Sequence, residues 1–69
     1  MKKSEVNYTL QVNNENLSDR HSQREVTKLA KLYALDSDNE VYVRWFRYHD
    51  YQSGFLNSDG DHEITGYRW

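Results

Sequence analysis

The sequence predicts a small α+β domain of order β-α-β-β-β, in which one helix packs on one face of an antiparallel-rich sheet. Three features predict this fold: an alternating segment near the start, a helical segment with an apolar stripe, and a later run of β-branched and aromatic residues. Packing the helix across the sheet is the simplest way to bury both apolar surfaces. We expect a single domain over residues 1–69, since a chain this short buries only about 60% of the surface of its unfolded form.

The first strand is predicted over residues 6–12, where apolar and polar side chains alternate without interruption. A period of two is typical of a strand with one covered and one solvated face. The Asn-rich residues 13–16 favour a turn, so we expect the strand to end there. The covered face would carry Val6, Tyr8, Leu10 and Val12.

A helix is predicted from Ser22 to about Leu35. Ser22 and Glu25 have the spacing of a capping box, in which each side chain binds a backbone amide at the helix start. Ser18 offers an alternative start, and the turn-favouring residues 36–39 end the helix. The stripe facing the sheet would consist of Val26, Leu29, Ala30 and Tyr33, which recur at helical spacing.

Three further strands are predicted after the helix. Residues 40–49 are dominated by β-branched and aromatic side chains, which favour strands. Residues 54–57 form a short strand, and Gly60 then supplies a turn with positive φ. Residues 62–69 form the last strand, with a bend at Gly66. The pattern leaves the strand order open, as well as whether the strands on either side of the helix run parallel.

The composition excludes several kinds of site. The chain has no cysteine, which removes disulfides and thiolate zinc sites. No nucleophile motif or phosphate-binding glycine loop is present, and a domain this small has little depth for a substrate pocket. We therefore expect no enzyme, no cofactor and no small-molecule substrate. No apolar run approaches a membrane span and no signal peptide is evident, so we expect a soluble, cytoplasmic protein.

Metal sites are also not expected. His49 and His62 each stand beside carboxylates, but neighbours along a strand point to opposite faces, so His62 cannot share a site with both Asp61 and Glu63. The acidic stretch at 36–40 resembles the start of a calcium loop, but it lacks the glycine and the glutamate that such a loop requires at its sixth and twelfth positions.

The aromatic residues are concentrated in the second half of the chain, where all but Tyr8 and Tyr33 lie. If Val41, Val43 and Trp45 meet the helix, the alternate side chains lie on the far face. Tyrosine, tryptophan and arginine are enriched at binding hot spots. The competing interpretation is that the small core wraps around these rings. The predicted interaction surface consists of Tyr42, Arg44, Phe46 and Tyr48, to which a regular last strand would add Tyr67 and Trp69.

A basic ridge is predicted on the side of the helix opposite its apolar stripe. Four cations there could contact phosphates of a nucleic acid, although a solvated helix face is the simpler explanation for a protein of net charge −2. The candidate phosphate contacts are Arg20, Arg24, Lys28 and Lys31.

Two functions follow as hypotheses. The favoured one is a small binding protein whose aromatic and arginine sheet face binds a protein partner or a second copy; by analogy, such a protein could be an inhibitor or accessory protein of a mobile genetic element such as a phage. The alternative is a single-stranded RNA or DNA binding module that combines stacking on the sheet with the basic ridge.

Overall fold

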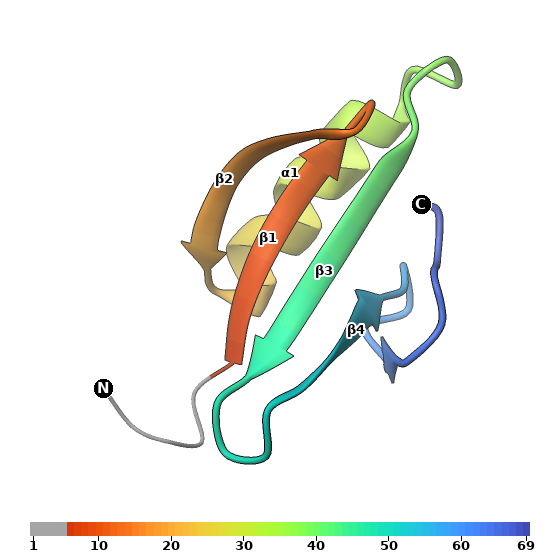
Figure 1. The fold of residues 1–69 in the computed structure, drawn as a ribbon. Helices are drawn as coiled ribbons and strands as arrows, with labels where there is room; N and C mark the ends of the chain where they lie inside the picture. Colours follow the sequence, from red (N-terminus) through yellow and green to blue (C-terminus); the bar gives the residue numbers. More distant parts are fainter. Residues whose placement is uncertain (1–5) are drawn as a thin grey trace.

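The computed structural model describes the backbone of residues 6–69 and the side chains of residues 6–17 and 22–69. A five-stranded antiparallel sheet of order β2-β1-β3-β4-β5 carries a single helix on one face, as Figure 1 shows, which confirms the predicted α+β class. The elements are β1 (Val6–Val12), β2 (Glu15–His21), α1 (Gln23–Ala34), β3 (Val41–Arg47), β4 (Gln52–Leu56) and β5 (His62–Glu63).

The strand β2 was not predicted, so the observed element order is β-β-α-β-β-β and the predicted order β-α-β-β-β is wrong. The Asn-rich stretch does end β1, but it does so by reversing the chain into a hairpin. Asn13 and Asn14 have φ values of 53° and 68°, and Val12 pairs with Glu15 on either side of them. Two left-handed residues in a two-residue loop match the twist of the flanking strands, and asparagine adopts this conformation more readily than most residues.

The extra strand also sets the direction of β3. A direct strand–helix–strand connection would place its two strands in parallel. Here β2 has already reversed the chain before α1 begins, so β3 returns antiparallel to β1 along its full length, from Val6 opposite Arg47 to Val12 opposite Val41. The strands predicted over residues 6–12 and 40–49 are therefore antiparallel, whereas β2 and β3, the strands on either side of α1, run in the same direction with β1 between them.

The helix begins as predicted. The Ser22 hydroxyl accepts a hydrogen bond from the Glu25 amide at 3.2 Å and caps the helix. Val26 and Ala30 are fully buried, and Leu29 packs against the core while remaining partly exposed. Tyr33 keeps 38% of its surface exposed, so the predicted stripe is correct in its first three members and weaker at its last. Among residues 6–69, no helix is both long and apolar enough to cross a membrane.

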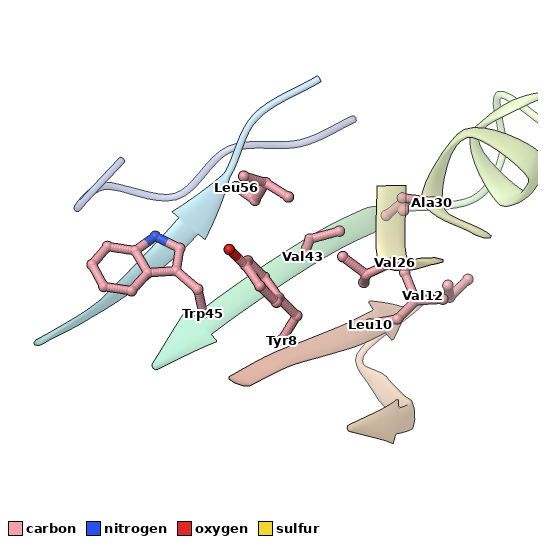
Figure 2. Close-up of a cluster of buried hydrophobic side chains, with 9 residues drawn as sticks. Tyr8, Leu10, Val12, Val26, Ala30, Val43, Trp45 and Leu56 are labelled. Carbon is pink, nitrogen blue, oxygen red and sulfur yellow. The ribbon is translucent and has the colours of Figure 1, made fainter. Parts of the chain in front are cut away.

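The core lies between α1 and the sheet (Figure 2). Alternate residues of β1 and β3 face the helix in register, with Leu10 opposite Val43 and Tyr8 opposite Trp45. The predicted covered face of β1 is thus confirmed, with Val6 at its margin. The buried side chains are Tyr8, Leu10, Val12, Val26, Ala30, Val41, Val43, Trp45 and Leu56.

The last strand is much shorter than predicted, because β5 ends at Glu63 and residues 64–69 form no strand. The chain end instead closes beside the start of β3. The Trp69 amide donates to the Val41 carbonyl at 2.9 Å, and the Trp69 indole N–H donates to the Leu56 carbonyl at 2.8 Å. One hydrogen bond from the Trp69 backbone and one from its side chain therefore hold this end of the chain against β3 and β4.

Gly54 is required by a close approach of two strands. The Trp45 indole N–H donates to the carbonyls of Phe55 and Glu63, at 3.1 and 3.3 Å. This draws the Glu63 carbonyl over Gly54, where a Cβ atom would collide with backbone. Gly60 has the predicted positive φ, 91°.

We predict that Gly54→Ala destabilises the protein, because the added methyl group has only backbone to displace. The cost should be about 1–3 kcal/mol in the free energy of unfolding, the range for overpacking a tight site. Gly66→Ala is the matched control, since a Cβ atom there would make ordinary contact with the Phe55 ring. Thermal unfolding of both variants checks this; equal midpoints would show that the strands can separate at Gly54 without loss.

Candidate interaction surface

One face of the sheet is not covered by the helix. Strand alternation directs Val41, Val43 and Trp45 toward α1, and in Figure 1 the helix lies behind the sheet. The side chains between them point to the opposite side, which we call the open face. Its described residues are Asn7, Thr9, Gln11, Asn16, Tyr42, Arg44, Phe46, Ser53, Phe55 and Glu63 on the strands, joined by Tyr48 after β3.

The aromatic side chains of the open face form two clusters. Phe46 meets Tyr48 edge to face, with centroids 4.9 Å apart, and lies 6.3 Å from Tyr51. Tyr42 meets Phe55 edge to face at 5.8 Å. Edge-to-face packing is a favoured arrangement of aromatic rings, so the rings hold one another in place on an otherwise uncovered surface.

Arg44 lies between the two clusters, in one cross-strand row with Thr9 and Phe55. Its guanidinium carbon is 6.0 Å from the Phe55 centroid, within reach of a cation–π attraction. Arg44 is exposed, and no acidic side chain of the described part of the chain lies within ion-pair distance of it.

Arg47, three residues further along β3, contrasts with Arg44. Its guanidinium donates to both carboxylate oxygens of Asp50, at 3.0 and 2.8 Å, and to Gln52 at 2.8 Å. These hydrogen bonds lower the pKa of Asp50 and raise the pKa of Arg47. Arg47 therefore closes the turn after β3, whereas no described group accepts a hydrogen bond from the Arg44 guanidinium.

A shallow hollow of about 340 Å³ opens on this face. Its lining combines one cation with neutral hydrogen-bonding groups and ring edges, and the Asn7 amide is fixed by donating to the Tyr48 hydroxyl at 2.9 Å. This arrangement can bind a polar or anionic group at its centre and apolar groups around it. The lining residues are Asn7, Thr9, Asn16, Arg44, Trp45, Phe46, Tyr48 and Ser53.

The structure brings together four of the six predicted surface residues: Tyr42, Arg44, Phe46 and Tyr48. The other two lie elsewhere, because the regular last strand that would have added them does not form. Trp69 packs against the core, and the Tyr67 hydroxyl hydrogen-bonds the Ser58 hydroxyl at 2.8 Å.

Sequence reasoning missed Phe55 and Tyr51 as members of this surface. Phe55 could have been found, since it alternates with Gly54 and Leu56 in a predicted strand, and both of these neighbours are buried. Tyr51 carries no such signal. It lies in the turn between β3 and β4 with a φ of 55° and is 80% exposed, a conformation that is rare for a bulky residue.

The basic ridge lies on the other side of the molecule. Arg24, Lys28 and Lys31 are exposed on α1, turned away from the buried Val26 and Ala30, while Arg20 lies outside the residues whose side chains are described. The sheet and helix therefore separate the ridge from the open face, and a single bound strand could not use both along a short path.

His62 lies on the helix side of the sheet, at its edge. Its Nε2 atom is 2.7 Å from the Tyr8 hydroxyl, and its ring packs on Tyr8 and Trp45 with centroids 5.7 and 5.3 Å apart. Tyr8 also hydrogen-bonds Gln23 at 3.3 Å, which links β5 to the start of α1. His49 is exposed in the turn after β3. Among the residues described, no group of three His, Cys, Asp or Glu side chains could hold a metal ion.

The pKa of His62 is lowered, first by burial of its packed edge and then by the charge of Arg47, against a smaller opposing effect of Asp61. The unfolded chain, with a histidine pKa near ~6.5, therefore binds the proton more readily than the folded protein. His62 contributes stability that is complete above that pH and is lost as the pH falls through the lower folded-state pKa.

We predict that the thermal midpoint falls as the pH drops below about 6.5, and that His62→Gln flattens this dependence. His49→Gln is the comparison variant, because His49, unlike His62, has no described ring or hydrogen-bond partner. Unfolding scans across the pH range check both variants. An unchanged pH dependence in the His62 variant would mean that another group is responsible.

Comparison with known proteins finds no match: no protein-family model, no curated protein and no solved structure resembles this chain significantly.

Proposed function

We propose that this protein is a non-enzymatic binding protein that uses the open face of its sheet to bind a protein partner. The observation that carries the proposal is the position of Arg44 between two aromatic clusters on the face that α1 leaves uncovered. Aromatic residues and arginine dominate the energetic centres of protein interfaces. Aromatic side chains left partly exposed on an uncovered sheet face are typical of a surface that another molecule covers.

The charges of the two surfaces favour a protein over a single-stranded nucleic acid. Binding of a nucleic-acid strand needs cations that follow its phosphates, together with rings on which bases stack. The open-face strand positions whose side chains are described include one cation, Arg44, and the ridge of Arg24, Lys28 and Lys31 faces away from it. The net charge of −2 further weakens attraction to phosphate.

Self-association is less well supported than a different partner. A two-fold axis through Arg44 would bring two guanidinium groups together, which is unfavourable. Pairing through sheet edges is also disfavoured. The β1–β2 ladder has register shifts at Tyr8/Thr9 and Leu10/Gln11, and β5 has only two residues. Bulges and short edge strands are devices that prevent edge-to-edge pairing.

Within this proposal, an inhibitor or accessory protein of a mobile genetic element such as a phage, acting in the cytoplasm, fits a small acidic chain that offers one binding face. This finer assignment rests on analogy, and the partner's identity would decide it.

We predict that a Phe46→Ala/Tyr48→Ala variant weakens partner binding at least ~30-fold, the loss expected for hot-spot residues, while the fold survives. Leu32→Ala/Leu35→Ala is the matched control, because these side chains, in the last turn and at the C-cap of α1, are 63% and 82% exposed and also present apolar surface. Capture from cells of the source organism, followed by titration of the purified partner, measures the effect. Circular dichroism confirms that both variants fold.

A photo-crosslinking amino acid locates the contact. Placed at Tyr51, beside Phe46 on the rim of the open face, it should crosslink to the partner; placed at Leu35 on the helix, it should not. Crosslinking from Leu35 alone would place the binding surface at the end of the helix and contradict the proposal. Undiminished partner binding by the Phe46→Ala/Tyr48→Ala variant would contradict it as well. A collapsed circular-dichroism spectrum of that variant would contradict it too, since the rings would then be core.

A further inference from the structure

The hollow on the open face has a lining that suits an anion. Its described side chains offer amides from Asn7 and Asn16 and hydroxyls from Thr9, Tyr48 and Ser53, and Arg44 is the one charged residue among them. Amide and hydroxyl groups can donate to an anionic oxygen, so the lining provides several donors around a single positive charge.

The donors of Arg44 are not used within the described part of the chain. Arg47 donates to Asp50 and Gln52, and Arg68 donates to the carbonyls of Ser37 and Asn39, at 3.1 and 3.0 Å. These two arginines hold the protein's own turns together. Arg44, by contrast, has only the Phe55 ring as a described partner, and a ring leaves the edge of the guanidinium fork available.

Two acidic residues lie on the row of Arg44, and each is two strands away from it. Asp19 lies beyond Thr9 and Glu63 lies beyond Phe55, which at strand spacing is about 10 Å. One Glu63 carboxylate oxygen already accepts a hydrogen bond from the Asn57 amide at 3.0 Å. The positive charge at the centre of the open face is thus left for a bound molecule.

The position of Arg44 constrains what can bind. The Phe46 cluster and the Tyr42–Phe55 pair lie on either side of it, so a partner that covers both clusters must also cover Arg44. Burying a guanidinium group without an anionic partner is strongly unfavourable. A surface that is apolar throughout would therefore bind poorly, whereas a carboxylate can accept two parallel hydrogen bonds from the guanidinium fork.

We infer that the hollow receives an acidic side chain, aspartate or glutamate, of a protein partner whose neighbouring apolar side chains cover the two aromatic clusters. A carboxylate fits better than the phosphates of a nucleic acid, which repeat along a strand and need more than one cation. This inference rests on the proposed binding function and adds the chemistry of the partner at its centre.

Selection from a library of random displayed peptides tests the inference without a known partner. Peptides selected on the wild-type protein should carry an aspartate or glutamate flanked by apolar residues. For a selected peptide, Arg44→Glu should raise the Kd by about 30-fold or more, as expected for a buried hot-spot charge. Arg44→Lys should have an intermediate effect, because it keeps the charge and loses the fork. Selection on the Arg44→Glu protein should favour lysine or arginine instead.

Arg24→Glu is the matched control, because it makes the same change in net charge at an exposed position on α1, away from the open face. It should leave peptide binding within about twofold, since screening limits exposed charges at a distance. An equal effect of Arg24→Glu and Arg44→Glu would mean that only overall charge matters, which would overturn the inference.

The remaining outcomes separate this inference from the proposed function. Peptides that lose binding in Phe46→Ala/Tyr48→Ala but show no acidic preference would overturn the inference and leave the proposed function in place. If the selected peptides bind the Phe46→Ala/Tyr48→Ala variant as tightly as the wild-type protein, or if no peptide is selected, both the inference and the proposed function are contradicted. Two further results would assign Arg44 to another partner and overturn the inference. One is that the protein binds a labelled single-stranded oligonucleotide and Arg44→Glu abolishes this binding. The other is that light scattering shows a dimer and Arg44→Glu abolishes the dimer.

Discussion

The structure depends on one constraint: a single helix of 12 residues packs on a sheet whose central strand is apolar on both sides. Val41, Val43 and Trp45 of β3 use up the surface that α1 can cover. Tyr42 and Phe46, which alternate with them, are left on the other face with Arg44 between them. Neither the short chain nor the lone helix can cover both sides. The open face is therefore a consequence of the same packing that makes the core.

The hydrogen bonds at the edge of the core explain how residues 62–69 are arranged. The Trp45 indole N–H lies where β4 and β5 converge and donates to both of their carbonyls. A buried indole N–H needs such an acceptor, and Gly54 allows the second carbonyl to approach. Glu63, which provides this carbonyl, is the last residue of β5. The chain then turns toward β3, where Trp69 binds Val41 and Leu56 and covers part of the core.

Local patterns predicted the elements that bury a periodic apolar surface, and they failed where no such period exists. Strict alternation identified β1 and both faces of β3, and Ser22 with Glu25 marked the start of α1. The sequence of β2, ENLSDRH, has one apolar residue and pairs through register shifts, so nothing in it indicates a strand. The surface residues on β3 followed from alternation, whereas the positions of Tyr51, Tyr67 and Trp69 depend on turns and on a chain end that carry no period.

Hydroxyl-radical footprinting of the isolated protein tests most directly whether the aromatic rings of β3 are divided between a covered and an open face. After correction for the intrinsic reactivity of each residue type, Phe46 and Tyr48 should be oxidised faster than Tyr8 and Trp45, which keep only 5% and 4% of their surface exposed. Tyr51 should be the most reactive ring of the set. The contrary result is that Phe46 and Tyr48 are protected from oxidation as strongly as Tyr8 and Trp45, in a protein that light scattering shows to be monomeric. This result would mean that the core wraps around Phe46 and Tyr48. The open face would then not exist.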